Sequence, residues 1–264
     1  MPEGHTIRHL ATLHENAFVG TTIEAASPQG RFADGATQLN GRTMTQATAH
    51  GKHLFLHFDD DIVHIHLGLY GWFKLRKNKS QQPTENTRLR IMNGSYISDL
   101  SAPTKCEIID ADSVRKIKDR LGQDPLHADA DKEKVWEKIK KSSKSIGALL
   151  MDQSVIAGIG NVYRAEILFL ANQSPFVPGK QVTREVFDHI WNDSVRLLHI
   201  GAIDGRIMTV ADQHMTGEEV KVHGCAQLSY AYKQTGSSCR ICQTTIMQQE
   251  MAGRQLYWCP TCQA

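Results

Sequence analysis

The strongest chemical signal in the sequence is a set of four cysteines arranged as two CxxC pairs near the end of the chain. The pairs are "CRIC" (239–242) and "CPTC" (259–262). Each CxxC turn can present two thiolates on one side, and two such turns complete a tetrahedral zinc site. Because all four ligands would be thiolates, no coordination position stays open for catalysis. We therefore expect one structural Zn²⁺, held in a zinc-ribbon finger by Cys239, Cys242, Cys259 and Cys262.

The second signal is the opening "MPEGHT", which places Pro2 and Glu3 directly after the initiator methionine. Removal of Met1 would leave Pro2 with a free secondary amine. An α-amine has a reference pKa of about 7.7–8.0, against about 10.4 for lysine, so part of it is neutral near pH 7. A helix expected over residues 5–16 would place its positive end beside this nitrogen and disfavour the ammonium form. Taken alone, the pair is either a nucleophile with an acid or a chance N-terminus.

Two further segments could bind anions. "AGIGNVYRAEILFLA" joins two apolar helices, and Asn161 is expected at the N-cap of the second helix, beside exposed backbone N–H groups. "MAGRQLYW" lies between the CxxC pairs and places Arg254 near a hairpin tip, where a rigid guanidinium can bind a phosphate. The alternative for the first segment is a helix–helix turn that needs glycine. The alternative for Arg254 is an ordinary solvated side chain.

The elements that must position these residues change character along the chain. Short β-rich segments fill residues 20–110 and predict a two-sheet sandwich, with "FDDD" as a tight connection. After "LGQDPL" (121–126) the periodicity becomes helical. The helices are expected at about 131–143, 145–153, 161–171 and 182–200. An irregular stretch at about 205–230 is a candidate linker.

Composition narrows the function classes. The formal net charge is only +2, so the chain is no polycation, and the apolar fraction of 41% suffices for a core. No stretch of about 20 apolar residues indicates a transmembrane helix, and the N-terminus lacks an apolar signal segment. We expect a cytoplasmic protein, associated with the bacterial nucleoid, in which the cysteines bind metal rather than form disulfides.

Together these segments resemble one family, the bifunctional DNA glycosylases of the formamidopyrimidine-DNA glycosylase and endonuclease VIII type. The matching segments are "MPEG", "GKHLFLHF" (51–58), "HLGLYG" (66–71), "LGQDPL", "AGIGNVYRAEIL" (157–168) and "CRIC…GRQLYWCPTC". The resemblance implies an α+β multi-domain fold. It consists of an N-terminal helix with a β-sandwich (1–120), a helix–two-turn–helix α domain (121–225) and a zinc finger (226–264).

The resemblance also implies roles for individual residues. Pro2 would attack the sugar C1′ of a damaged nucleotide and form a Schiff base, and Glu3 would protonate the ring oxygen. Lys52, Asn161 and Arg254 would bind phosphates around the lesion, with Lys52 and Arg254 counted also among the catalytic residues. Leu69 and Tyr70 would wedge into the duplex and fill the space of the flipped base. The expected partner is damaged double-stranded DNA, bound by a monomer.

Two features favour the endonuclease VIII branch and therefore oxidised pyrimidines as substrates, cut by β,δ-elimination. Residues 98–109 lack the arginine-rich loop of the 8-oxoguanine-type members, and residues 69–71 read "LYG". Other members often have Pro-Glu where His5 and Thr6 stand, and an arginine at the position of Gln234. The alternatives are an oxidised-purine (8-oxoguanine or formamidopyrimidine) glycosylase, an abasic-site lyase, and a non-catalytic binder of damaged DNA.

Overall fold

The computed structural model describes residues 2–77, 81–215 and 228–264. The chain divides into two compact units, Met1–Arg120 and Leu121–Ala264. Each unit has its own apolar core and is described by itself below. The expected domain boundary between residues 225 and 226 falls in the segment 216–227, which lies outside the described residues. Cys225, a cysteine outside the two CxxC pairs, lies in the same segment.

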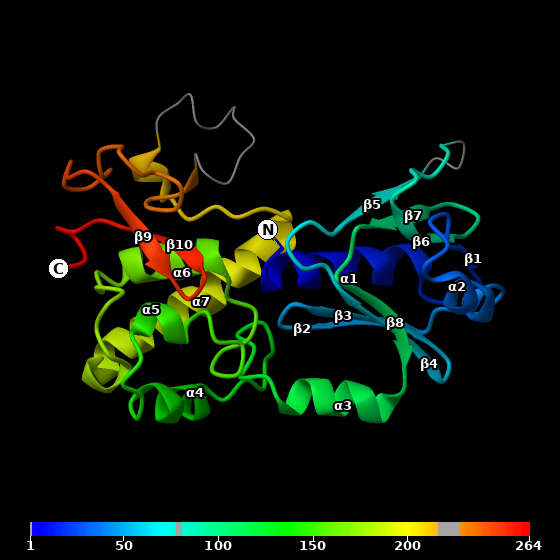
Figure 1. The fold of residues 1–264 in the computed structure, drawn as a ribbon, viewed down its shortest axis with the longest axis horizontal. Coiled ribbons are helices and arrows are strands. Elements are labelled where there is room, and N and C mark those ends of the chain that lie inside the picture. The colour runs from blue at the N-terminus through cyan, green and yellow to red at the C-terminus, as the bar shows by residue number, and fades with distance from the viewer. Residues whose placement is uncertain (1, 78–80, 216–227) are drawn as a thin grey trace. The chain divides into compact units, whose positions relative to one another are not determined.

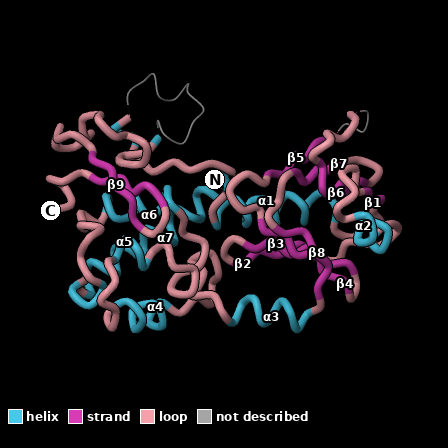
Figure 2. Tube along the Cα trace, viewed as in Figure 1, coloured by secondary structure: helices cyan, strands magenta, loops and turns pink. Residues whose placement is uncertain are grey.

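The N-terminal unit contains two four-stranded antiparallel sheets, ordered β1-β6-β7-β5 and β2-β3-β4-β8. Figure 2 shows these strands as two separate groups. The sandwich expected from the alternating segments is therefore confirmed. Its elements are α1 (Gly4–Phe18), β1 (Glu24–Ala26), α2 (Ala33–Leu39), β2 (Gln46–His50), β3 (His53–Phe58), β4 (Asp61–His66), β5 (Trp72–Arg76), β6 (Thr87–Met92), β7 (Ile97–Ser101), β8 (Lys105–Ile109) and α3 (Ala111–Asp119).

Helix α1 lies between the two sheets (Figure 1) and is hydrogen-bonded to both through its side chains. On one side the Glu15 carboxylate accepts a hydrogen bond from the Ala47 backbone N–H of β2 at 2.8 Å. On the other side His14 contacts Ser98 of β7 at 2.8 Å and packs edge-on against the Phe73 ring of β5. Because α1 is fixed to both sheets, its first residues have a defined place in the unit.

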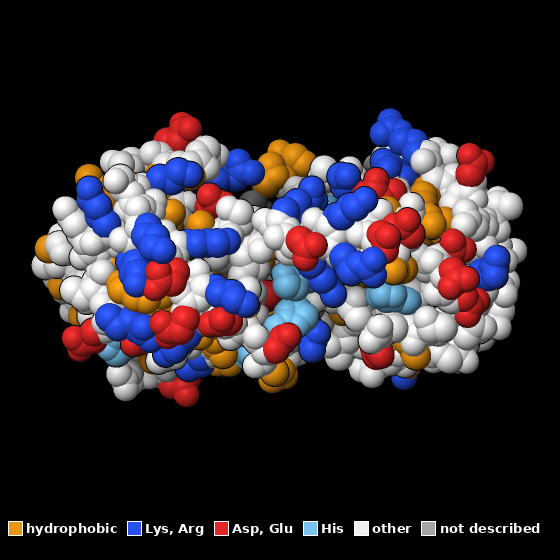
Figure 3. Space-filling view, turned by 90° about the horizontal axis from the view of Figure 1, so that it is seen from below, with side chains coloured by type: hydrophobic (Ala, Val, Ile, Leu, Met, Phe, Trp, Pro, Cys, Tyr) orange, Lys and Arg blue, Asp and Glu red, His pale blue; other side chains and the backbone are white. Residues whose placement is uncertain are grey.

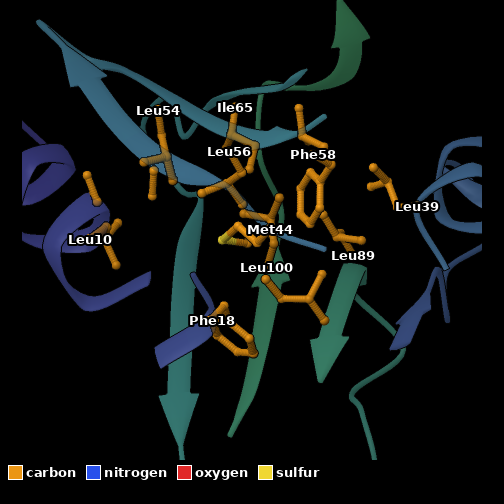
Figure 4. Packing of buried hydrophobic residues seen from close by; sticks show 14 of the residues in the cluster. Leu10, Phe18, Leu39, Met44, Leu54, Leu56, Phe58, Ile65, Leu89 and Leu100 are labelled. Carbon is orange, nitrogen blue, oxygen red and sulfur yellow. The ribbon is translucent and has the colours of Figure 1, made fainter. Parts of the chain in front are cut away.

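The core of this unit lies between the sheets and one face of α1 (Figure 4). Leu10 and Phe18 of the helix, Leu54 and Leu56 of β3 and Leu100 of β7 are all buried there. Leu54 and Leu56 are two positions apart in β3, so both side chains point to the same face of the strand. Burial of such side chains stabilises the fold by about 1.5–3 kcal/mol each.

Helices α2 and α3 were not expected from the sequence. In α3 the Asp110 side chain accepts a hydrogen bond from the Ser113 backbone N–H at 2.8 Å, which caps the helix. Val114 and Ile117, one turn apart, are its buried face. Because only these two large apolar residues stand among many charged ones, the sequence of α3 shows no clear helical periodicity.

The C-terminal unit is mainly helical and ends in a two-stranded antiparallel sheet. Its central helix α6 is buried along almost its whole length and contributes Tyr163, Ile167 and Leu168 to the core. The elements are α4 (Lys132–Ile139), α5 (Ile146–Leu149), α6 (Asn161–Leu170), the 3₁₀ turn Gly179–Gln181, α7 (Arg184–Asp204), the 3₁₀ turn Asp212–His214, β9 (Met247–Met251) and β10 (Arg254–Trp258). No described helix is both long enough and apolar enough to cross a membrane.

Two of the four expected helices are shorter than the sequence pattern indicated. The helix expected over 145–153 is the single turn Ile146–Leu149. Beyond it the Asp152 carboxylate accepts hydrogen bonds from the backbone N–H and hydroxyl of Ser154, a local turn that competes with continued helix. The helix expected over 131–143 ends at Ile139, and α7 extends to Asp204, where Gly205 ends it with φ of 69°.

Candidate functional site

The chain enters α1 through a buried acidic residue. Glu3 is the N-cap of the 15-residue helix and has no exposed surface. Its backbone N–H reaches the Thr6 hydroxyl at 3.5 Å, part of a capping box that fixes the first turn. Pro2, half-buried, directly precedes it. The structure thus places Pro2 and Glu3 at the positive end of the helix, as the sequence predicts.

His5, on the first turn of α1 beside Glu3, carries no charge at neutral pH. Burial, and then the adjacent His9, lower the pKa of His5 to about 3. The His5 ring also contacts the Thr6 hydroxyl at 3.0 Å. Because the His5 imidazole is neutral, the electrostatic potential near Pro2 comes mainly from the helix terminus and from Glu3.

Lys52 occupies the β2–β3 turn, after Gly51 with φ of 55°, and is half-buried. A hydrogen-bonded chain of a carboxylate and two imidazoles lies on the neighbouring strands. His64 Nδ1 contacts Glu107 at 2.9 Å, and His64 Nε2 contacts His53 Nδ1 at 2.8 Å. Burial, followed by the nearby charges, lowers the pKa of His53 to about 3. His53 is therefore neutral at the end of this row of hydrogen-bonded side chains. The row fixes the start of β3, directly after Lys52.

Leu69 and Tyr70 lie in the β4–β5 connection and are exposed by 44% and 82%. Gly68 turns the chain there with φ of 67°, and a Cβ at this position would lie 1.9 Å from the Thr104 hydroxyl. The connection therefore presents two large apolar side chains to solvent instead of burying them in the core. This exposure is what a wedge needs.

Asn161 is the first residue of α6, whereas Gly160 is its N-cap, so the predicted N-cap position of Asn161 is wrong by one residue. The cause is the extended backbone of Gly160, with φ of −126° and ψ of −158°. The Asn161 side chain is nearly buried, and its Nδ2 donates to the Gln255 carbonyl of β10 at 2.9 Å. The amide is therefore tied to the hairpin that carries Arg254.

The sequence reasoning missed Arg164, although it stands inside the quoted motif one turn after Asn161. Arg164 is fully buried. Its guanidinium donates to the Met251 carbonyl at 3.0 Å, to the Gln255 carbonyl at 3.2 Å and to the Asn161 side-chain oxygen. It therefore joins both strands of the β9–β10 hairpin to the start of α6. The i, i+3 spacing from Asn161 was the available signal.

Arg254 begins β10, directly after the turn formed by Ala252 (φ 54°) and Gly253 (φ 67°), and is exposed. Beneath this turn the hairpin rests on α5. A Cβ on Gly147 would lie 2.8 Å from the Met251 sulphur and 2.9 Å from the Pro175 carbonyl oxygen. The Ser145 hydroxyl also contacts the Met251 sulphur at 3.6 Å. The guanidinium thus projects from a hairpin supported on two sides.

The four predicted cysteine ligands converge at the base of the hairpin. Their sulphurs all lie within 4.8 Å of one another, with 3.8 Å between Cys239 and Cys262 and 3.4 Å between Cys242 and Cys259. A tetrahedron with Zn–S bonds of about 2.3 Å has S···S edges of about 3.8 Å. Backbone N–H groups of Ile241 and Cys262 point at the Cys239 and Cys259 sulphurs and fix their positions. The residues present therefore fit one four-coordinate metal ion.

Comparison with known proteins gives the family. Residues 1–99 match the formamidopyrimidine-DNA glycosylase N-terminal domain, and residues 121–212 match the formamidopyrimidine-DNA glycosylase H2TH domain. The chain belongs to the formamidopyrimidine-DNA glycosylase and endonuclease 8 family. Members of this family are DNA glycosylases that also act as lyases at abasic sites.

Relatives are found in both branches. "Endonuclease 8 1" of Mycobacterium bovis is 43% identical over 268 residues and covers all of both chains. A formamidopyrimidine-DNA glycosylase of Prochlorococcus marinus is 32% identical over 207 residues, 75% of this chain and 69% of that protein. The complex of Lactococcus lactis Fpg with DNA containing an abasic site has a TM-score of 0.81 at 24% identity, covers 99% of each chain and shows the shared fold.

Residues 98–109 cross from one sheet of the N-terminal unit to the other by a short connection. Residues 98–101 lie in β7 and 105–109 form β8, joined by a tight turn in which Ala102 has φ of 47°. Only residues 102–104 separate the two strands, so no long probing loop is present at this place. The site residues of the family pattern thus fall into two groups, Pro2, Glu3, Lys52, Leu69 and Tyr70 in one unit and Asn161, Arg254 and the cysteines in the other.

Proposed function

We propose that this chain is a bifunctional glycosylase and abasic-site lyase of base excision repair that acts on oxidised pyrimidines in double-stranded DNA. The observation that carries the proposal is the start of α1, where Pro2 precedes a fully buried glutamate at the positive end of the helix. A protein that only binds DNA needs neither residue. The 43% identity to an endonuclease 8 and the short connection between β7 and β8 support pyrimidine over purine lesions.

The first step exchanges the damaged base for the enzyme. After removal of Met1, the Pro2 nitrogen attacks C1′ of the damaged nucleotide, the N–C1′ bond forms, and the bond from C1′ to the base breaks with its electrons leaving on the base. The nitrogen then loses its proton. As the C1′–O4′ bond opens, Glu3 donates a proton to O4′ and the nitrogen becomes a charged iminium.

The iminium makes strand scission easy because it acidifies the C2′ proton. Loss of that proton forms a C2′–C3′ double bond and breaks the C3′–O bond, which releases the 3′ phosphate. A second elimination, which begins with loss of the C4′ proton, breaks the C5′–O bond and releases the 5′ phosphate. Water then hydrolyses the remaining link and restores the Pro2 amine.

We assign the DNA contacts to three domains, residues 1–120, 121–225 and 226–264. Lys52 and Arg254 bind phosphates through charge, and Asn161 does so through its second side-chain N–H, the first being used on Gln255. Leu69 and Tyr70 enter the duplex as the damaged nucleotide is flipped out, since an apolar wedge offsets a few kcal/mol of unstacking. Their exposure and the fixed Arg254 hairpin support these roles.

We also propose that the metal held by Cys239, Cys242, Cys259 and Cys262 is Zn²⁺. An all-thiolate set at tetrahedral spacing suits zinc and leaves no open position, so the ion supplies structure to the hairpin and takes no part in the reaction.

Borohydride trapping tests the proposed chemistry. The mature chain should form a covalent adduct with duplex DNA that carries an abasic site or an oxidised pyrimidine, because reduction fixes the iminium. A chain with one residue kept in front of Pro2 should lose the adduct. Pro2→Gly, which keeps an N-terminal amine, is the matched control and should retain it. Normal scission by the extended chain would refute Pro2 as the nucleophile, and preferred cleavage of 8-oxoguanine duplexes would place the enzyme in the purine branch.

A further inference from the structure

A pocket of about 410 Å³ lies in the C-terminal unit, beside the hairpin that carries Arg254. Its walls come from three segments: the end of the α4–α5 connection, α5 with the turn after it, and the β9–β10 turn. The lining residues are Lys144, Ala148, Met151, Asp152, Ala252 and Arg254. Of these, only Arg254 belongs to the family pattern found in the sequence.

The pocket brings two cations and one carboxylate together. Lys144 Nζ lies 3.7 Å from Asp152 Oδ2, and the two side chains are exposed by 69% and 34%. Such an exposed pair contributes only about 0–1 kcal/mol, so Lys144 can exchange Asp152 for another anion. Asp152 itself is held in place by the Ser154 hydroxyl at 2.6 Å, the main cause of its lowered pKa. The carboxylate therefore stays while the lysine is free to turn.

Lys144 differs from the other lysines of the basic segment 138–144. Lys138 donates to the Ser154 carbonyl at 2.5 Å, and Lys140 and Lys141 both pair with Glu137. Lys144 alone among these four lines the pocket with Arg254. Of these four lysines, Lys144 is therefore the one that lies at the pocket lined by Arg254.

We propose that Lys144 and Arg254 together bind a backbone phosphate of the DNA in this pocket, and that Lys144 leaves Asp152 for that phosphate. The guanidinium supplies two directed hydrogen bonds and the ammonium a mobile point charge. The inference rests on the proposed function, since the ligand is DNA, and it adds a contact from the α4–α5 connection. Asp152 opposes the phosphate and lowers the affinity of the site.

Salt dependence of binding tests the contact directly. The probe is a duplex with a tetrahydrofuran abasic-site analogue, titrated between 50 and 200 mM salt. Lys144→Met should weaken binding and reduce the slope of log K against log salt by about 0.9, the effect of one lost phosphate contact. Lys141→Met removes the same charge three residues earlier and should leave the slope unchanged. Equal slopes for the two variants would overturn the proposal.

Two further variants test the partners. Asp152→Asn keeps an oxygen for Ser154 and removes the competing charge, so it should tighten binding, and weaker or unchanged binding would overturn the exchange. Lys144→Met combined with Arg254→Met should cost less than the sum of the single changes in log K, because both residues bind one phosphate.

Trapping at saturating enzyme separates this inference from the proposed function. The control Lys141→Met should form the covalent adduct as fast as the parent chain once bound. Absence of trapping in the parent chain refutes the proposed chemistry. Normal trapping with an unchanged salt slope refutes only the Lys144 contact.

Discussion

At the scale of single residues, the N-terminal unit is built around histidines that the fold keeps neutral. Burial lowers the pKa of His14 to about 4, although its Nδ1 contacts the Leu10 carbonyl at 2.7 Å, which acts in the opposite direction. Burial similarly lowers the pKa of His5 and of His53 to about 3. Each of these side chains has a folded pKa below the usual 6.5, so the unfolded chain binds the proton first.

Acid should therefore destabilise this unit well before its carboxylates titrate. Stability that is full above pH 6.5 should fall as pH drops toward 4, by about 1.4 kcal/mol per pH unit for each such histidine. His14→Gln removes one titration, so its free energy of unfolding should change less steeply over this range. Urea unfolding monitored through hydrogen exchange of the β3 amides measures the slope. Exposed His189→Gln is the control, and a slope for His14→Gln as steep as that of the control would contradict the argument.

At the scale of elements, one buried arginine joins the hairpin to the helix. Arg164→Leu leaves the Met251 carbonyl and the Asn161 side-chain oxygen without their donor, and each such buried group costs about 1–3 kcal/mol. We expect faster hydrogen exchange in β9 and β10 and at least tenfold weaker binding to abasic-site duplex, because Arg254 loses its fixed position. Arg196→Leu, on the surface of α7 and paired with Asp193, is the matched control. Unchanged affinity of Arg164→Leu would show that the hairpin docks without it.

Much of the element layout could be predicted from the sequence, for identifiable reasons. Strands β3 and β4 are short β-rich segments joined by the tight "FDDD" connection, and the CxxC spacing leaves few alternatives to a metal site. The early end of α5 could not be predicted, since it depends on hydrogen bonds that Asp152 makes to Ser154. The Glu107–His64–His53 chain joins three strands by side-chain contacts whose register no periodicity reveals. Lys144 was visible only as part of a charged segment, because its role depends on a pocket wall from a distant hairpin.

At the scale of the whole molecule, charge is balanced rather than concentrated. The chain carries 30 Lys and Arg against 28 Asp and Glu, and Figure 3 shows the two kinds interspersed over the face drawn. Binding should therefore depend on a few placed cations and not on a broad positive field.

With Lys52, Lys144 and Arg254 as the cations at phosphates, log K against log salt should fall with a slope of about −2.7 for an undamaged or abasic duplex. Fluorescence anisotropy over a salt series measures it. A slope near −6 or steeper would mean that the surface contributes many contacts beyond these three. Lys52→Met should lower the slope by about 0.9, as Lys144→Met does.

Gly147 determines how closely the β9–β10 hairpin, which carries Arg254, packs on α5. With no side chain, it lets the Met251 thioether settle close to the helix, while the Pro175 carbonyl closes the other side. The width of one methyl group at this position would lift the hairpin tip or push residue 175 aside. The position of the Arg254 guanidinium thus depends on the lack of a side chain at Gly147. Gly147→Ala is the smallest substitution that would shift it.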